Sequence, residues 1–359
     1  MRITFLMPSD NLTGGNRVVA IYAQQLIKCG HGVLVVSCAQ DRLGLREAAR
    51  AVLKQDWSRL RQHNPSQPGH IAQSGVPHKV LERPRAITAA DVPDADIVIA
   101  TWWETAVWMD AMPAAKGRKV HLIQGYEIWL GPKYIPQVHA ALRLPNTKIA
   151  ISRNLQETIV GEVTGLSMHV VPNAVDLQQF QAPARTRNAT PRVGFVYAHA
   201  AIKGADVCIQ AYTLARARLP ELRVLAFGTE KPNQALPLPS GAEFFHRPAQ
   251  DTLREHYAAC DVWLFGSRLD SFGLPILEAM ACRTPVVAVP IGAAPDLLEG
   301  GGGVLVPGES PQAMADAIVR ICTQDVRDWQ AMSGRAHATA NGYSWTDATQ
   351  RLLAAIGSV

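Results

Sequence analysis

The stretch that decides the fold is DVWLFGSRLDSFGLPILEAMA, residues 261–281. DVWLFG is typical of a buried strand, SRLDSFG of a loop, and PILEAMA of a helix with Pro275 in its first turn. Loops at the carboxyl ends of strands carry the ligands of open α/β sheets. Asp270 lies in this loop and Glu278 inside the helix, and a buried carboxylate is costly unless something binds it. We therefore expect a site at this strand–loop–helix unit.

The chemistry of this unit fits a ligand with both phosphate and hydroxyl groups. Backbone N–H groups of Phe272, Gly273 and Leu274 at the helix start form a ready anion site. The carboxylates of Asp270 and Glu278 accept hydrogen bonds from hydroxyl groups. A nucleotide sugar carries both kinds of group. The alternative is that Glu278 complements the helix dipole and Asp270 caps the turn, and these residues alone leave both readings open.

Strands and helices alternate along the whole chain in two blocks, which predicts parallel sheets covered on both faces. The expected strands are ITFLM (3–7), GVLVVS (32–37), DIVIAT (96–101), KVHLIQ (119–124), KIAIS (148–152) and HVVPN (169–173), then RVGFVY (192–197), LRVLAFG (222–228), DVWLFG (261–266), PVVAVP (285–290) and GVLVP (303–307). The polar stretch between the blocks suits a linker. We predict an α/β protein with two doubly wound, Rossmann-like domains facing across a cleft. The predicted parts are an N-terminal acceptor-side domain (1–175), a linker (176–191), a C-terminal donor-binding domain (192–342) and a crossing helix (343–359).

Bulk properties exclude several classes of protein. A chain of 359 residues exceeds the usual size of one core, and no run reaches the length of a membrane span. The amino terminus MRITFLMPSD indicates a first strand and not a signal peptide. Six cysteines without CxxC spacing predict reduced, mostly buried thiols in a cytoplasmic protein. A net charge of +5 suits anionic ligands but is too mild to predict nucleic-acid binding.

The stretch DSFGLPILEAMACRTPVV (270–287) resembles the signature of family 4 retaining glycosyltransferases, which have the GT-B fold. Other stretches resemble the family's glycine loop, interdomain segment, lysine loop and final helix, in the same order. They are GGNRVVAIYAQQLIKCGH (14–31), VVPNAVDLQQF (170–180), VGFVYAHAAIKGADVCIQAY (193–212) and YSWTDATQRLL (343–353). The resemblance is to members of the bacterial polysaccharide and lipopolysaccharide type.

The resemblance implies a role for each matching residue. The implied catalytic residues are Lys203 on the donor's pyrophosphate, Asp270 on the sugar hydroxyls and Glu278 on the ribose hydroxyls. The implied donor-binding residues are Gly14, Gly15, Arg247, Arg268, Ser271, Phe272, Gly273 and Leu274. Gly15 would let the backbone approach the β-phosphate without a Cβ in the way.

Three positions depart from the family pattern. Asp270 stands where the family usually has Glu, which leaves the identity of the sugar open. Phe195 stands where the family usually has an arginine, so Lys203, helix ends and Arg17 or Arg268 would neutralise the pyrophosphate. Many members carry a histidine where this chain reads Gln-Gly-Tyr-Glu (124–127), and His121 falls inside a strand as a core or face residue.

Two features of the first domain point to the acceptor. The expected acceptor contacts are Asn16, Arg17, Trp103, Tyr126, Glu127 and Trp129. Among them, the aromatic rings of Trp103, Tyr126 and Trp129 can stack on sugar rings. Core packing is the alternative for any one aromatic residue. In residues 42–57, Arg42, Arg46, Arg50 and Lys54 recur beside an apolar stripe. Such a helix can lie on an anionic membrane surface, although a solvated basic face is the commoner outcome.

The sequence predicts no metal site and no cofactor. Asp94 and Asp96 form an Asp-x-Asp pair, but they precede the strand DIVIAT and do not end one, and no other cluster has ligand spacing.

These observations predict a cytoplasmic, metal-independent glycosyltransferase, peripheral at the inner face of the plasma membrane if residues 42–57 touch lipid. It would move a hexosyl or deoxyhexosyl group from a nucleotide-diphosphate sugar to a glycan or lipid-linked acceptor in cell-surface polysaccharide or lipopolysaccharide synthesis. A nucleotide-sugar epimerase of the same fold is one alternative. A non-catalytic binding partner is another, with Phe195 and Asp270 as its evidence.

Overall fold

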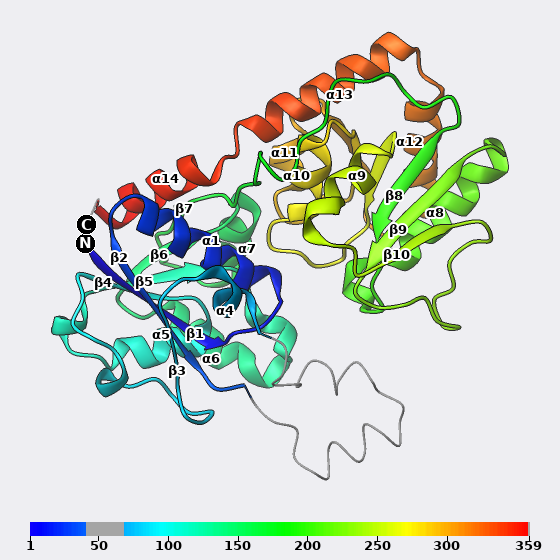
Figure 1. The fold of residues 1–359 in the computed structure, drawn as a ribbon. Coiled ribbons are helices and arrows are strands. Elements are labelled where there is room, and N and C mark those ends of the chain that lie inside the picture. Colours follow the sequence, from blue (N-terminus) through cyan, green and yellow to red (C-terminus); the bar gives the residue numbers. More distant parts are fainter. Residues whose placement is uncertain (41–67, 358–359) are drawn as a thin grey trace. The chain divides into compact units, whose positions relative to one another are not determined.

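The protein folds into two α/β units, seen in a computed structural model that describes residues 1–40 and 68–357 (Figure 1). The first unit comprises the described parts of Met1–Ile151, Gln156–Val171 and Trp345–Val359. The second comprises Ser152–Leu155 and Pro172–Ser344. The basic stretch predicted at 42–57 lies outside the described residues.

The first unit is built on a seven-stranded parallel sheet with the order β3-β2-β1-β4-β5-β6-β7. Its strands are β1 (Arg2–Ser9), β2 (Gly32–Cys38), β3 (His78–Val80), β4 (Ile97–Ala100), β5 (Arg118–Ile123), β6 (Thr147–Ala150) and β7 (His169–Val170). Its helices are α1 (Gly14–Lys28), α4 (His70–Ser74), α5 (Trp103–Asp110), α6 (Ile135–Leu142), α7 (Arg153–Glu162) and α14 (Trp345–Gly357), with short 3₁₀ turns that include η3 (Glu127–Leu130) and η4 (Pro132–Tyr134). The strand order reverses between β1 and β4, so loops after these strands meet at a switch point.

The second unit repeats the plan with a six-stranded parallel sheet of order β10-β9-β8-β11-β12-β13. Its strands are β8 (Arg192–Val196), β9 (Arg223–Gly228), β10 (Glu243–His246), β11 (Val262–Phe265), β12 (Val286–Ala288) and β13 (Gly303–Leu305). Its helices are α8 (Ala205–Arg218), α9 (Leu253–Ala258), α10 (Leu274–Ala281), α11 (Ala294–Leu298), α12 (Pro311–Thr323) and α13 (Val326–Asn341), with the 3₁₀ turns η5 (Ala201–Lys203) and η6 (Gln250–Thr252). The switch point here lies between β8 and β11.

The predicted fold class is confirmed: both sheets are parallel and Rossmann-like, and every expected strand is present. Two further strands, β3 and β10, were not predicted; each lies at an edge of its sheet. Their sequences HKV and EFFH are short and partly polar, because an edge strand is covered less than a central one.

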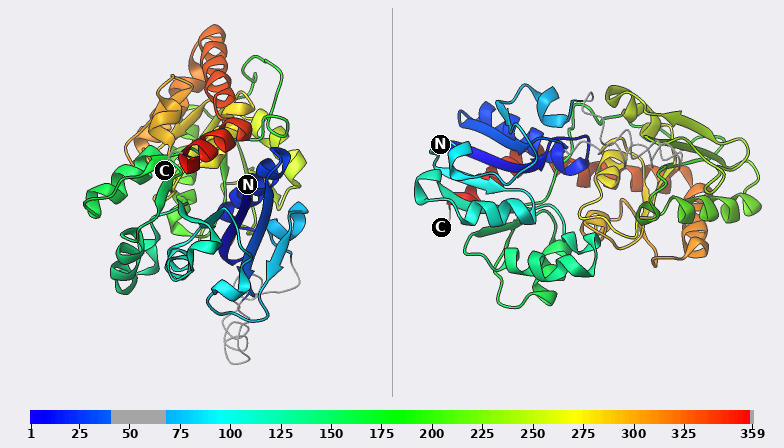
Figure 2. Two further views of the ribbon diagram at one scale, coloured as in Figure 1. Left: turned by 90° about the vertical axis from the view of Figure 1, so that its left-hand side faces the viewer. Right: turned by 90° about the horizontal axis from the view of Figure 1, so that it is seen from below.

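The last helix returns to the first unit, and Figures 1 and 2 show α14 beside α1, although the two lie at opposite ends of the sequence. Tyr22 of α1 meets Trp345 of α14 edge to face, with ring centroids 5.3 Å apart. The chain leaves the second unit at Ser344, which forms a bridge with Val175. Residues 176–191, predicted as a linker, belong to the second unit, where Arg185 and Asn188 bind the buried carboxylate of Asp261.

All six cysteines are free thiols, and five of them are buried. Within residues 1–40 and 68–357, no helix has the length and hydropathy needed to cross a membrane.

Candidate functional site

The second unit brings Lys203 and Asp270 together at its switch point. Lys203 ends η5, the turn that follows β8, and Asp270 lies in the loop between β11 and α10. The two side chains form an ion pair, with Lys203 Nζ 2.9 Å from Asp270 Oδ2. Residues far apart in the sequence thus meet because β8 and β11 are neighbours in the sheet.

Asp270 also caps the turn that leads into α10. Its Oδ1 accepts from the backbone N–H of Phe272 at 3.1 Å and of Gly273 at 2.7 Å. This corrects one expectation: the N–H groups of Phe272 and Gly273 are already bound by the chain's own carboxylate. The capping alternative is therefore the one that the structure shows for Asp270, with Lys203 as an added partner.

Glu278 is buried in α10, with 6% of its surface exposed. Its Oε2 accepts from the hydroxyl of Tyr257 on α9 at 2.7 Å. Tyr257 is itself packed among aromatic rings, 4.4 Å from Trp263 and 5.5 Å from Phe227 between centroids. Tyr257 was not predicted, because no motif in LREHYA marks it and only the packing of α9 against α10 brings its phenol to Glu278.

Arg268 binds the loop that carries Lys203, through Ala201 and Asp206 on either side of it. Its guanidinium binds both oxygens of Asp206 at 2.8 Å, both oxygens of Glu309 and the carbonyl of Ala201 at 2.6 Å. These contacts use all five N–H donors of an arginine. Arg268 holds the pKa of the Asp206 carboxyl below its ordinary range. In this arrangement Arg268 positions η5 and α8, and its contact with the donor stays a prediction.

Two glycines let the lysine loop approach β11. Gly204, which follows Lys203, has φ +62°, and a Cβ there would lie 1.8 Å from the carbonyl oxygen of Gly266. Only glycine fits this close contact without moving the backbone. Because Gly204 has no side chain, the backbone can pass close to β11, and this places Lys203 within hydrogen-bond distance of Asp270.

The remaining donor-side residues are more scattered. Phe195 is buried in β8, so it supplies no charge to the site. Arg247 follows β10 with φ 51°, an uncommon backbone conformation for a residue with a side chain, and its Nε donates to the carbonyl of Thr229 at 3.1 Å. The backbone carbonyl of Ser271 accepts from Ser152 Oγ at 2.7 Å.

In the first unit, Gly14 and Gly15 are the first two residues of α1, directly after β1. A Cβ on Gly15 would touch the side chain of Gln124 at 3.4 Å, while one on Gly14 would meet nothing within 4 Å. Asn16 is buried and donates to the carbonyl of Ser9 at 2.8 Å, and Arg17 is partly buried. Asn16 therefore holds the end of β1, which makes it a structural residue here.

Four aromatic residues of the first unit form two pairs of neighbouring rings. Trp103 lies 6.4 Å from Tyr134, and Trp102 lies 5.9 Å from Trp129, which is 46% exposed. The exposed ring of Trp129 is therefore accessible from solvent.

Tyr126 of the first unit lies outside these two pairs and is buried. Its hydroxyl lies 2.6 Å from Nε2 of His139 on α6, a residue that was not predicted as a partner. Tyr126 is thus better explained as packing than as an acceptor contact.

Glu127 and His121 are buried ionisable groups of the same region. Glu127 is 2% exposed, and burial raises its carboxyl pKa to about 8. His121 lies inside β5 as a core residue, as predicted, and burial lowers its pKa to about 3. Both groups are therefore neutral or nearly so at pH 7.

The described residues offer no ready metal site. Asp94 pairs with Lys116 at 2.9 Å, and Asp96 accepts from the backbone N–H of Arg2 at 2.6 Å just before β4. No group of three His, Cys, Asp or Glu side chains within residues 1–40 and 68–357 is arranged to hold a metal ion. Metal independence stays a prediction.

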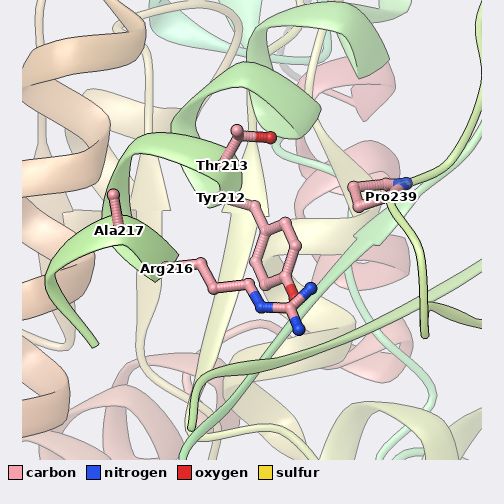
Figure 3. A pocket seen from close by; sticks show the side chains of 5 residues that line it. All are labelled: Tyr212, Thr213, Arg216, Ala217 and Pro239. Atoms are coloured by element: carbon pink, nitrogen blue, oxygen red, sulfur yellow. The ribbon is translucent and has the colours of Figure 1, made fainter. Parts of the chain in front are cut away.

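One pocket of about 290 Å³ lies on α8, away from the residues above (Figure 3). Tyr212, Thr213, Arg216 and Ala217 of α8 line it opposite Pro239. Its polar groups are already engaged, since Arg216 donates to the carbonyl of Ser240 and Tyr212 to that of Leu222. It contains none of the predicted site residues.

Comparison with known proteins adds to this geometry. Residues 190–324, which contain Lys203, Asp270 and Glu278, match the model of the family described as glycosyl transferases group 1. A D-inositol 3-phosphate glycosyltransferase of Xylanimonas cellulosilytica is 32% identical over 213 residues, and that of Actinosynnema mirum is 33% identical over 215. These alignments cover 52% of this chain and 50% and 51% of the relatives, so the chain spans about half their length.

Solved structures resemble the whole chain in fold. The Anabaena protein HepE, in complex with UDP and glucose, aligns with a TM-score of 0.73 over 100% of both chains at 20% identity. TarM aligns with a TM-score of 0.74 over 99% of this chain and 98% of its own, at 12% identity. WaaG, a glycosyltransferase involved in lipopolysaccharide biosynthesis, aligns with a TM-score of 0.61 over 98% of both chains, at 14% identity.

The chain is thus a two-domain α/β protein with neighbours among glycosyltransferases of the GT-B fold. More particularly, its segment 190–324 matches the model of the group 1 glycosyl transferases.

Proposed function

We propose that this protein is a retaining glycosyltransferase that takes a sugar from a nucleotide-diphosphate donor. The observation that carries the proposal is the ion pair of Lys203 and Asp270 at the β8/β11 switch point, followed by the buried Glu278 in α10, all within the segment that matches the family. Solved neighbours that bind UDP or UDP-glucose support a nucleotide-sugar donor.

The proposed chemistry follows from charge development. The bond between the anomeric carbon and the diphosphate oxygen breaks, the acceptor oxygen bonds to that carbon, and the acceptor proton passes to the leaving diphosphate. Negative charge therefore grows on the diphosphate, where the ammonium group of Lys203 would stabilise it. Removal of one such preorganised donor typically costs about 3 kcal/mol of transition-state stabilisation.

Binding of nucleoside diphosphates tests the donor site. We expect one of UDP, GDP, dTDP and ADP, in EDTA and at 100 times its dissociation constant, to stabilise the wild type by about 2.7 kcal/mol. NAD should not, and Glu278→Ala should lose the effect while still unfolding cooperatively. Thermal unfolding measures this. If no nucleoside diphosphate stabilises the wild type, the donor site is wrong and a binding-partner role takes its place.

For the acceptor we propose a glycan or lipid-linked glycan in cell-surface polysaccharide synthesis, with Trp103 and the exposed Trp129 as contacts. The names of the curated relatives favour a second candidate, a phosphorylated cyclitol such as D-inositol 3-phosphate. Transfer of labelled sugar to each acceptor separates the two. Conversion of the donor without any acceptor would instead reveal an epimerase.

A further inference from the structure

Three protein donors converge on the carboxylate of Asp270. Oδ1 accepts from the N–H groups of Phe272 and Gly273, and Oδ2 accepts from Lys203. A carboxylate has about four acceptor positions, so these contacts leave about one, on Oδ2. Because 18% of the Asp270 side chain is exposed, a small donor can reach that position from solvent.

These three donors are also the groups that a phosphate would choose at this helix start. A bare nucleoside diphosphate therefore meets a negative carboxylate that already holds them, and like charges repel. The hydroxyl of a donor sugar differs, because it can donate to the remaining position on Oδ2 and form a charge-assisted hydrogen bond. The same carboxylate should oppose one ligand and favour the other.

We propose that Asp270 is a specificity-determining residue that makes the site prefer a nucleotide sugar over the bare nucleoside diphosphate left after transfer. The inference rests on the proposed function and concerns the same site. Asp270 can play this part because its short side chain folds back onto its own loop and binds the N–H groups two and three residues ahead. Glu278 does not share it, since its carboxylate is buried against Tyr257.

The test compares the dissociation constants of a matched pair of ligands. UDP and UDP-glucose, GDP and GDP-mannose, and ADP and ADP-glucose are titrated calorimetrically in EDTA, and the tightest pair is kept. In Asp270→Asn the amide oxygen can still accept from both N–H groups, but the charge is gone. We expect the diphosphate to bind more tightly and the nucleotide sugar more weakly, so that their affinity ratio shifts by roughly tenfold, or about 1.4 kcal/mol.

Two further variants control the result. Asp270→Ser keeps a turn-capping oxygen and removes the charge, so it should shift the ratio in the same direction if the Asn variant folds poorly. Asp328→Asn removes an exposed charge on α13 and should leave the ratio unchanged.

The possible outcomes are distinct. If both ligands weaken by the same factor, Asp270 acts only on loop structure and the proposal is overturned. If the nucleotide sugar weakens while the diphosphate does not change, Asp270 is an ordinary sugar ligand, and the proposal is again overturned. If the wild type binds no member of any pair, the proposed function itself fails, and the inference falls with it.

Discussion

At the scale of single residues, the Glu278 carboxylate is held by the hydroxyl of Tyr257 inside an aromatic cluster. We expect Tyr257→Phe to lower the free energy of unfolding by about 1.5–3 kcal/mol, because a hydrogen bond to a buried charge is lost. Nucleotide binding should weaken with it, since Glu278 loses its orientation. Chemical denaturation and calorimetric titration measure the two effects.

Tyr212→Phe is the matched control for this variant. Tyr212 is also buried, but its hydroxyl donates to the uncharged backbone carbonyl of Leu222 at 3.2 Å. Its loss should cost about 1 kcal/mol and leave nucleotide affinity unchanged. Equal losses of affinity in both variants would mean that Tyr257 acts through general packing.

Glu127 makes stability depend on pH. Its carboxyl has an ordinary pKa of about 4.5 in the unfolded chain and a pKa of about 8 in the folded chain. Between these values the unfolded chain binds fewer protons, so stability falls as pH rises, by up to about 1.4 kcal/mol per pH unit. Glu127→Gln should therefore stabilise the protein progressively from pH 5 to pH 8.

Denaturation curves at pH 5, 6, 7 and 8 measure this gain. Glu157→Gln, at an exposed position on α7, should show no such trend. A constant difference between Glu127→Gln and wild type across the range would show that Glu127 ionises normally.

At the scale of elements, the junction of η5 and α8 depends on the close approach of two backbones. Gly204→Ala adds a Cβ 1.8 Å from the Gly266 carbonyl and also requires φ +62°. The backbone conformation alone costs roughly 1–2 kcal/mol, and relief of the clash moves Lys203, so we expect a loss of at least about 3 kcal/mol and weaker nucleotide binding. Equilibrium denaturation measures the first and titration the second.

Gly75→Ala is the control that separates conformation from contact. Gly75 has a similar φ of +74°, but a Cβ there meets nothing within 4 Å. It should lose only the conformational part, roughly 1–2 kcal/mol. If both variants lose equally, the contact with Gly266 is unimportant.

Elements also show which parts of the fold the sequence can predict. Central strands such as β1 and β11 are continuous apolar runs because both faces of a parallel sheet are covered, so they were found. The edge strands β3 and β10 lack that signal, so they were missed. Lys203 and Asp270 were predicted because they lie in stretches that resemble a family signature, whereas no such signature marks the stretches that hold Tyr257 and His139.

At the scale of the whole molecule, the first unit is completed by the end of the chain. Trp345 is 7% exposed and packs on Tyr22, and Leu352 and Ile356 of the same helix are buried. Trp345→Ala should destabilise by about 3–5 kcal/mol, as for other large buried aromatics. Hydrogen exchange should show the loss in the first sheet, with the second sheet still protected.

Gln350→Ala, at an exposed position of the same helix, should change neither stability nor exchange by more than about 0.5 kcal/mol. If Trp345→Ala instead speeds hydrogen exchange in the second sheet, α14 does not stabilise the first unit in particular.

The sequence by itself determined the alternation of strands and helices and the presence of two sheets. It could do so because the apolar runs of strands buried on both faces of a sheet, and the residues that favour turns, are patterns of neighbouring residues. Only the tertiary structure decided what each charged group binds. Asp270 pairs with Lys203 and accepts hydrogen bonds from its own loop. Arg268 donates to Asp206, Glu309 and Ala201. Glu278 accepts a hydrogen bond from Tyr257. The physical reason is that a hydrogen bond or ion pair depends on distances of about 3 Å between groups that the chain brings together only when the sheets form.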